Sequence, residues 1–194
     1  MTAFADFDPR PIIVSIAGPN GAGKTTFFHS HLKTAGLRFV NADVLAADIG
    51  MEPYAAARLA DALRRALVAR KESFVFETVF SDPVGERIAF LEEAARYGYV
   101  VVLCYIGLSS PDQSAERVAM RVSQGGHDVP DEKLRSRFPR TLANLETAIR
   151  RLPQVLVYDN SDLNLPFRHV AWFVHGQARH LHEPTPDWLR PLIT

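Results

Sequence analysis

Short apolar runs alternate with amphipathic stretches along most of this chain. The runs are rich in β-branched and aromatic residues, and each is short enough to be a strand. They cover residues 12–16, 37–40, 73–79, 99–108 and 154–158, with a looser sixth run at 167–174 that is typical of an edge strand. Strands that alternate with helices predict a three-layer α/β fold with a mainly parallel sheet of five or six strands.

The stretches between these runs carry apolar residues at helical spacing, and Gly or Pro marks several of their ends. Gly36 closes a first helix over residues 25–33, and Pro53 divides residues 43–70 into two helices. Further helices are predicted at 83–97, from Ser110 or Asp112 to 123, and at 131–152, the last interrupted or kinked near Pro139.

The first apolar run leads into a glycine-rich segment that matches the P-loop pattern G-x-x-x-x-G-K-[ST] at every fixed position. Glycines here let the backbone turn tightly and gather N–H groups around a phosphate, and the helix that follows offers its N-terminal dipole to the same anion. Lys24 is then placed for the β- and γ-phosphates, and the Thr25 hydroxyl for Mg²⁺. The predicted ATP-binding residues of this loop are Gly18, Pro19, Asn20, Gly21, Ala22, Gly23, Lys24, Thr25 and Thr26.

Polar side chains also follow the other predicted strands. Asp43 comes after the second run, Glu77 and Thr78 end the third, and Asp159 with Asn160 end the fifth. Because ligands of open parallel sheets bind beyond the carboxyl ends of the strands, we expect these groups to gather around the P-loop. They suit Mg²⁺, phosphate or a substrate hydroxyl.

Composition limits the class of protein. The chain has 194 residues, of which 47% are hydrophobic, enough for one domain with a substantial core. Lys and Arg number 22, as do Asp and Glu, so the overall charge indicates neither a nucleic acid nor a membrane surface as partner. No apolar run approaches the roughly 20 residues of a membrane-spanning helix.

The single cysteine, Cys104, lies in the fourth apolar run, which is typical of a buried thiol. We expect a soluble, cytoplasmic protein with one domain over residues 1–194, a helical lid at about 110–140 and an irregular tail at about 176–194.

Two common P-loop classes do not fit. The same loop sequence also occurs in ABC transporter ATPases. Those proteins carry a Leu-Ser-Gly-Gly-Gln signature, which Ser123-Gln124-Gly125-Gly126 matches only in part. The strand at 154–158 is followed by Asp-Asn, without the glutamate that would activate water in such an ATPase. A GTPase would need a guanine-binding Asn-Lys-x-Asp segment, and the sequence has none.

The remaining motifs, over about residues 12–161, resemble the zeta toxin family of P-loop kinases, whose founding members phosphorylate UDP-N-acetylglucosamine. They occur in order along the chain as Asn41-Ala42-Asp43, Phe74-Val75-Phe76-Glu77-Thr78, Arg117 to Val122, Gly125-Gly126-His127-Asp128-Val129-Pro130, Arg137, Arg140, Asn144-Leu145 and Asp159-Asn160-Ser161. The Gly-Gly-His-x-Val-Pro version is similar to a short chromosomal branch of that family. The resemblance implies ATP and Mg²⁺ as cofactors and adds an antitoxin protein as a candidate partner.

The resemblance also implies roles for the acidic residues. Asp43 matches the catalytic base and is expected to contact the substrate, on a strand beside the P-loop strand. The alternative is that Asp43 caps the helix that follows. Glu77 and Thr78 match the segment that binds substrate and helps to order Mg²⁺ together with Thr25, whereas the alternative for Glu77 is a purely structural partner. Asn160 is placed near the adenine or the base of the lid, and a capped turn is the equal alternative.

Arginines make up the third part of the predicted site. Six basic and three acidic residues lie between positions 117 and 140, and such a segment forms a lid over ATP in P-loop kinases. Arg121 and Arg137 are the candidates for neutralising charge in the transition state, and Arg117 and Arg140 for binding ATP. Residues 53–70, with Arg58 and either Arg64 or Arg65, are expected to wall the substrate pocket, although the helical apolar spacing there is equally explained as core. Arg58 is the candidate contact for a phosphate or carboxylate of the substrate.

Three functions remain open at this point. The first is an ATP- and Mg²⁺-dependent kinase, that is, a phosphotransferase with an alcohol group as acceptor. Its substrate would be a hydroxyl group of a small metabolite such as a UDP-activated amino sugar. The second is a small-molecule kinase of the gluconate or shikimate type. The third is a regulatory ATP-binding module without turnover, for which a catalytic base at Asp43 would be unnecessary.

Overall fold

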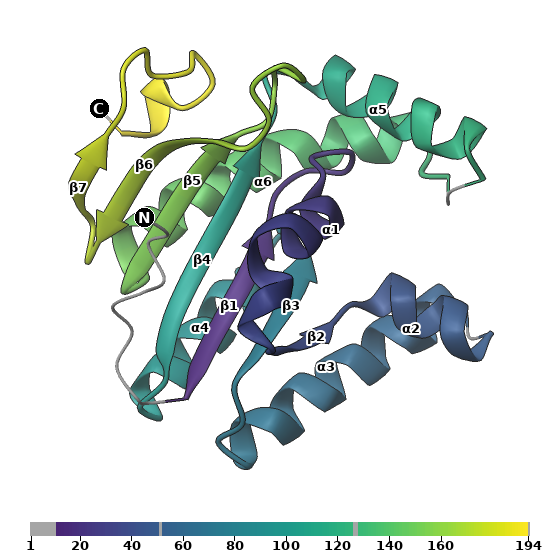
Figure 1. The fold of residues 1–194 in the computed structure, drawn as a ribbon, viewed down its shortest axis with the longest axis vertical. Coiled ribbons are helices and arrows are strands. Elements are labelled where there is room, and N and C mark those ends of the chain that lie inside the picture. Colours follow the sequence, from purple (N-terminus) through teal and green to yellow (C-terminus); the bar gives the residue numbers. More distant parts are fainter. Residues whose placement is uncertain (1–10, 51, 126–127, 194) are drawn as a thin grey trace.

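The computed structural model describes residues 11–50, 52–125 and 128–193, and these form one seven-stranded sheet (Figure 1). The strands lie in the order β2-β3-β1-β4-β5-β6-β7; the first five are parallel, and β6 and β7 are antiparallel to their neighbours. The strands are β1 (Ile12–Ala17), β2 (Arg38–Val40), β3 (Phe74–Thr78), β4 (Val100–Gly107), β5 (Gln154–Asp159), β6 (Arg168–Val174) and β7 (Gln177–Leu181).

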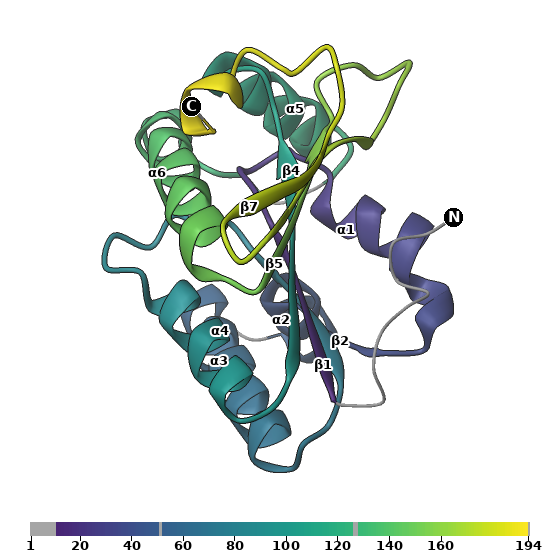
Figure 2. The same cartoon turned by 90° about the vertical axis from the view of Figure 1, so that its left-hand side faces the viewer.

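Helices cover both faces of this sheet. Figure 2 shows α3, α4 and α6 on one side and α1 on the other, which confirms the three-layer α/β prediction. The α-helices are α1 (Lys24–Phe27), α2 (Ala42–Ile49), α3 (Pro53–Ala69), α4 (Glu86–Arg96), α5 (Pro111–Ser123) and α6 (Asp131–Arg151). A π-helical segment (Phe28–Leu32) and a 3-10 turn (Lys33–Ala35) continue α1, and Gly36 ends this run in the left-handed conformation.

The core consists of two apolar clusters, one on each face of the sheet. Alternate residues of β1 enter different clusters, so that Ile13 packs with residues of α3, α4 and α6 while Val14 packs with Phe27 and Phe28. Every residue of β4 is buried, as expected of a central parallel strand covered on both faces. Cys104 lies on this strand, and burial raises the pKa of its thiol, consistent with a packing role.

Two expectations about the strands were wrong. The run at 167–174 is a strand but not the edge, because β7 pairs outside it and gives the sheet seven strands. All five residues of β7 are exposed, so this part of the tail carries no apolar alternation that could have predicted a strand. β2 lies beside β3 and not beside the P-loop strand β1, so Asp43 does not follow a neighbour of β1.

The prolines act at helix ends and within one helix. Pro53 is the first residue of α3, where its missing N–H costs nothing, so the predicted division of residues 43–70 is confirmed. α6 continues as a single helix through Pro139, and the predicted interruption is absent from it. After β7 the chain folds back over the sheet with Trp188 and Leu189 buried, as expected of a covering tail.

Candidate active site

The P-loop follows β1 and is held close to the neighbouring strand. Gly18 has φ of 143°, and a Cβ added there would lie 2.2 Å from the carbonyl oxygen of Ile106 in β4. Gly23 has φ of 84°, and its Cβ would lie 3.0 Å from the amide nitrogen of Asn160. Only glycine permits both the backbone conformation and the close approach at Gly18. The cradle predicted from the sequence is therefore present and tightly enclosed.

Side chains from β5 and α5 support the loop from behind. Asn160 is buried; its Nδ2 donates to the carbonyl oxygen of Ala22 at 2.9 Å, and its Oδ1 accepts from the N–H of Phe167 at 3.1 Å. The Ser114 hydroxyl donates to the carbonyl oxygen of Asn20 at 2.7 Å. These bonds orient the loop's backbone. Direct contact of Asn160 with ATP stays a prediction, whereas its support of the P-loop is a feature of the structure.

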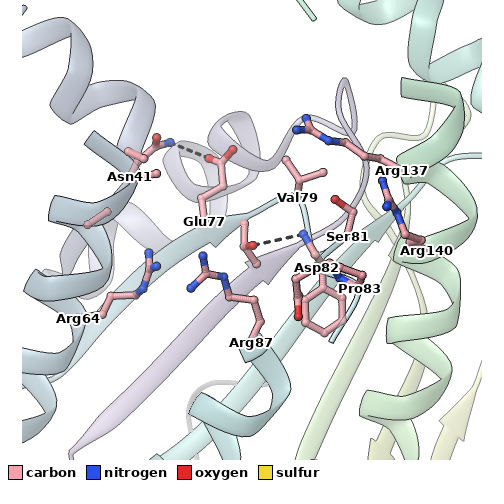
Figure 3. Close-up of a pocket in the computed structure, with 15 residues that line it drawn as sticks. Asn41, Arg64, Glu77, Val79, Ser81, Asp82, Pro83, Arg87, Arg137 and Arg140 are labelled. Atoms are coloured by element: carbon pink, nitrogen blue, oxygen red, sulfur yellow. Dashed lines mark hydrogen bonds between the residues drawn. The ribbon is translucent and has the colours of Figure 1, made fainter. Parts of the chain in front are cut away.

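Lys24 and Thr25, at the end of the loop, occupy different environments. Lys24 is 6% exposed, and its Nζ donates to the carbonyl oxygen of Pro19 at 2.9 Å, so the ammonium group folds back over the loop. Thr25 points toward β3, and its Oγ1 donates to Glu77 Oε2 at 2.7 Å. Asn41 Nδ2 donates to the same carboxylate oxygen at 2.9 Å, as the dashed line in Figure 3 marks. Three strand ends thus meet at Glu77, which joins β3 to the P-loop and to the end of β2.

Asn41 also takes part in starting α2. Its Oδ1 accepts from the N–H of Val44 at 3.4 Å, and its carbonyl oxygen accepts from the N–H of Leu45 at 3.0 Å. Asn41 therefore stands at the N-cap, and Asp43 lies inside the first turn of α2, which removes the alternative that Asp43 is the cap. The side chain of Asp43 lies outside what the structure describes, so its role as catalytic base stays a prediction.

A cavity of about 500 Å³ opens beside Glu77 (Figure 3). Thr78 and the segment 79–83 after β3 line its floor, α3 and α4 form one wall, and α6 forms the opposite wall. Asn144 on α6 donates to the carbonyl oxygens of Phe80 and Asp82 at 2.9 and 3.0 Å and holds this segment in place. The cavity therefore adjoins the carboxylate that contacts Thr25, at the carboxyl end of β3.

Four arginines line this cavity, two of them among those predicted from the lid. Arg137 and Arg140 extend from α6, as Figure 3 shows. Arg64 from α3 and Arg87 from α4 face them from the other side. Arg58 is exposed and is not among the residues that line the cavity, so the arginine that α3 contributes is Arg64 in its place.

Arg117 and Arg121 lie on α5 at different distances from the loop. A Cβ on Gly21 would lie 3.0 Å from the Cβ of Arg117, and Arg117 Nη2 donates to the carbonyl oxygen of Ser161 at 3.3 Å. Burial lowers the pKa of Arg117, and the Asp159 carboxylate opposes that shift. Arg121 lies one turn further along α5 and is exposed. Arg117 is thus beside the P-loop, and the structure does not bring Arg121 to the cavity.

The segment after β5 forms the predicted capped turn and also contacts α5, whereas its position near the adenine stays a prediction. Asp159 Oδ1 accepts from the N–H and the hydroxyl of Ser161 at 3.2 and 2.6 Å, which is a capped turn. The Ser161 carbonyl oxygen accepts from Gln113 and Arg117 of α5, so the turn also forms the base of the predicted lid. Residues 126–127, within the Gly-Gly-His-x-Val-Pro motif, lie outside the described residues.

Of the residues that line the cavity, Arg87 was not selected by sequence reasoning, Asn41 was noted only as part of a motif, and Arg64 was named as one of two alternatives, with Arg65, for the pocket wall. Helix phase separates Arg64 from the exposed Arg65, because positions 56, 60, 64 and 67 form one buried stripe on α3. An arginine on the buried face of an amphipathic helix needs a partner or a ligand, whereas Arg58 lies off this stripe. No comparable signal marks Arg87.

The glycine cradle, the lysine and threonine that follow it, and the open cavity at the carboxyl end of a parallel sheet define a P-loop kinase-like α/β protein. The chain belongs to the AAA domain family AAA_33, whose family model matches residues 13–140. No curated protein matches the chain.

Solved structures agree with this fold. A complex of AvrRxo1-ORF1 and AvrRxo1-ORF2 with sulphate ions matches with a TM-score of 0.71 and 19% identity over 95% of this chain and 64% of the other, and the same pair solved with ATP matches with a TM-score of 0.70. This chain thus spans about 64% of the length of that relative. The PezAT chromosomal toxin–antitoxin system of Streptococcus pneumoniae matches with a TM-score of 0.62 and 14% identity over 99% of this chain and 80% of the other. At such identities the likeness establishes the fold.

Two further properties bear on partners and metals. Across residues 11–50, 52–125 and 128–193, no helix has the length and apolar content needed to cross a membrane. Within the same residues, no three His, Cys, Asp or Glu side chains are grouped so that they could hold a metal ion. Mg²⁺ is usually bound in proteins by one or two carboxylates together with phosphate oxygens and water.

Proposed function

We propose that this protein is an ATP- and Mg²⁺-dependent kinase that transfers the γ-phosphate of ATP to a hydroxyl group of a small metabolite. The observation that carries the proposal is the hydrogen bond between Thr25 and Glu77. It joins the loop that would hold the donor to the carboxylate that borders the cavity for an acceptor. A pure binding module has no need of a second cavity next to its metal-binding threonine.

The residues present fit ATP and Mg²⁺. The glycines of the loop adopt positive φ angles, and Gly18 packs too closely on β4 for any side chain, as a backbone that wraps a phosphate requires. Lys24 folds over the same loop, where it is proposed to contact the phosphates. Thr25 Oγ1 and Glu77 Oε2 are hard oxygen ligands 2.7 Å apart, of the kind that Mg²⁺ prefers. When bound, Mg²⁺ would neutralise phosphate charge and orient the nucleotide.

The chain's own residues then divide the work of transfer. Asp43 is the proposed base that accepts the proton of the acceptor hydroxyl, from the first turn of the helix next to Glu77. Thr78 lines the floor below it and is a proposed contact for the acceptor. Arg137 and Arg140 reach the cavity from α6 and are proposed to offset charge on the transferring phosphate, with Arg117 at the nucleotide. Arg121 is exposed on α5 and is not among the residues that line the cavity.

The finer proposal is an activity of the zeta toxin type, with a UDP-activated amino sugar as acceptor and an antitoxin protein as partner. It is supported by the motifs that run from Gly18 to Ser161 in the order found in that family. PezAT is a chromosomal toxin–antitoxin system, and AvrRxo1-ORF1 was solved together with ORF2, so two proteins of this fold occur with a second protein. The proposal extends that arrangement to this chain.

Phosphate transfer can be tested without knowing the acceptor. The purified chain is incubated with Mg²⁺, γ-labelled ATP and either a small-molecule extract of cells or a panel of nucleotide sugars, and labelled products are identified by mass spectrometry. We expect label in a metabolite, and none with Lys24→Ala. Label in UDP-N-acetylglucosamine supports the toxin-like activity, and label in a sugar acid or polyol supports an ordinary metabolic kinase. Retention of all label in ATP and free phosphate would contradict the proposal.

A further inference from the structure

Two arginines share one carboxylate at the edge of the cavity. Arg87 donates to both oxygens of Asp61, from Nη1 at 2.6 Å and from Nη2 at 3.5 Å. Arg64, one helical turn after Asp61 on α3, also pairs with Oδ1 of that carboxylate. Figure 3 shows both guanidinium groups directed toward the interior of the cavity, below Glu77. Asp61 therefore holds two cationic groups next to each other.

The two arginines are enclosed to different degrees. The Arg64 side chain is 7% exposed and lies over the ring of Phe76, with its Cζ 4.9 Å from the ring centroid. Burial and, to a smaller extent, the charges of the nearby Arg87 and Arg65 together lower the pKa of Arg64 to about 10. The Arg87 side chain is 27% exposed. A buried guanidinium beside a second one is electrostatically costly, since one carboxylate compensates only one of the two charges.

Positively charged side chains outnumber negatively charged ones among the described residues that line the cavity. The described lining residues include four arginines and two acidic residues, Glu77 and Asp82, and Asp61 beside them adds a third carboxylate. Glu77 already accepts from Thr25 and Asn41. The Asp82 carboxylate is buried and accepts no hydrogen bond within the described part of the chain, and Arg137 and Arg140 form no ion pair there, so two arginines face one uncompensated carboxylate. An anion in the cavity would supply the missing charge.

A structural role for the cluster does not account for both arginines. Arg64 could be retained for packing on Phe76 and pairing with Asp61, since such contacts stabilise a buried guanidinium. Arg87 adds a second charge where the first is already paired, and it contributes unused N–H donors to a solvent-accessible space. A pair of forked donors in a cavity is the usual arrangement for binding a carboxylate or a phosphate.

We propose that Arg64 and Arg87 form a binding subsite for an anionic group, phosphate or carboxylate, on the acceptor molecule. The inference rests on the proposed function, because it assigns the cavity to an acceptor, and it deepens that function by naming the acceptor's class. The acceptor carries a reactive hydroxyl that lies toward Glu77 and a negatively charged group that lies toward α3 and α4. Neutral sugars and polyols lack the second group and are poor substrates.

The subsite can be tested by anion binding alone. The full chain is first saturated with Mg²⁺ and a non-hydrolysable ATP analogue, so that the P-loop is filled. Inorganic phosphate and malonate are then titrated separately at constant ionic strength, and binding is followed by calorimetry and by the melting temperature. The two probes separate a phosphate site from a carboxylate site. The variants are Arg87→Gln, Arg87→Lys and the control Arg96→Gln, an exposed arginine on the same helix that does not line the cavity.

We expect at least one probe to bind the wild type and Arg96→Gln equally. Loss of a charged, forked hydrogen-bond donor should raise the dissociation constant of Arg87→Gln by roughly tenfold to a hundredfold. Arg87→Lys should recover only part of the affinity, because lysine keeps the charge but loses the planar fork. Equal binding by all variants, or no binding of either anion by the wild type, would overturn the subsite.

A second measurement separates this inference from the proposed function. Turnover of a neutral acceptor, such as N-acetylglucosamine, is compared with that of its 1-phosphate and its UDP derivative. Higher kcat/KM for the charged members, lost through KM in Arg87→Gln, supports the subsite. Equal kcat/KM for neutral and charged members overturns the subsite and leaves the kinase intact, whereas anion binding without any phosphate transfer overturns the kinase and leaves the subsite intact.

Discussion

Glu77 connects the P-loop with the neighbouring cavity. Its carboxylate accepts from Thr25 of the P-loop and from Asn41 at the start of α2, and its side chain borders the cavity. A carboxylate at the end of an apolar strand is costly to bury without such partners. Its position is therefore stabilised by the same groups that it would bring to Mg²⁺ and substrate.

Replacing Glu77 by glutamine tests its proposed part in metal binding. Glu77→Gln keeps the size and an oxygen acceptor for Thr25, but it removes the charge that attracts Mg²⁺. Loss of one charged ligand contact, worth about 1.5–3 kcal/mol, should raise the Mg²⁺ concentration needed for half-maximal binding of a fluorescent ATP analogue by roughly tenfold or more.

Glu93→Gln, on an exposed position of α4 away from the cavity, is the matched control and should bind as the wild type does. An unchanged Mg²⁺ requirement in Glu77→Gln, with the melting temperature preserved, would remove Glu77 from the metal site.

At the scale of single residues, the P-loop and the acidic side chains at the ends of strands could be predicted from the sequence. The arginines that face the cavity could be predicted only in part. Glycine, lysine and threonine occupy places that the loop geometry demands, so a local pattern suffices for them. Arg58 and Arg64 lie on one helix, and which of them faces the cavity depends on how α3 packs against the sheet. The buried stripe through Ala56, Ala60 and Leu67 identifies Arg64 once helix phase is considered.

At the scale of elements, β6 and β7 hold a cluster of histidines. The ring centroids of His169 and His182 are 5.4 Å apart, those of His180 and His182 are 4.0 Å apart, and Tyr158 lies 5.2 Å from His169. His169 Nε2 is buried without a hydrogen-bond partner among the described residues. Burial, His182 and His180 lower the pKa of His169 below its ordinary value, and its hydrogen bond with the Ala171 backbone opposes this.

This arrangement predicts that the protein loses stability as the pH falls through the ordinary histidine range. The unfolded His169 binds a proton near pH 6.5, whereas the folded residue binds it only at lower pH. The stabilisation is therefore complete above that value and is lost progressively below it. We expect the melting temperature between pH 7.5 and pH 5.5 to fall less in His169→Asn than in the wild type, and His29→Asn, at an exposed histidine, to follow the wild type. Parallel curves for all three proteins would contradict this role.

The arrangement of the elements was only partly predictable. Alternating strands and helices indicate a parallel sheet, but the order β2-β3-β1 depends on which side of β1 each crossover returns to, and similar apolar strands do not encode this. β7 was missed because an exposed edge strand needs no apolar residues. β7 is identified as a strand by its pairing with β6, which is a property of the folded sheet and not of the local sequence.

At the scale of the whole molecule, the sheet brings the P-loop and the cavity proposed for the acceptor to one edge. The P-loop follows β1, Glu77 ends β3, and Asn160 follows β5 and supports the loop from the other side. This convergence follows from parallel strands whose carboxyl ends share an edge, which is why the position of the site was predictable although the strand order was not. The identity of the acceptor depends on the shape and charge of the cavity, which come from four separate segments.

The central claim is that this site transfers phosphate and does not merely bind ATP. The most direct measurement compares ATP binding with transfer of labelled γ-phosphate in wild type, Lys24→Ala and Asp43→Ala. We expect Lys24→Ala to lose both, because the lysine is proposed to contact the phosphates. Asp43→Ala should bind ATP as the wild type does and lose transfer by a factor of roughly 10² to 10⁴, the usual effect of removing a general base. Unchanged transfer in Asp43→Ala would remove it as the base, and wild-type protein that binds ATP without phosphorylating any acceptor would contradict the account.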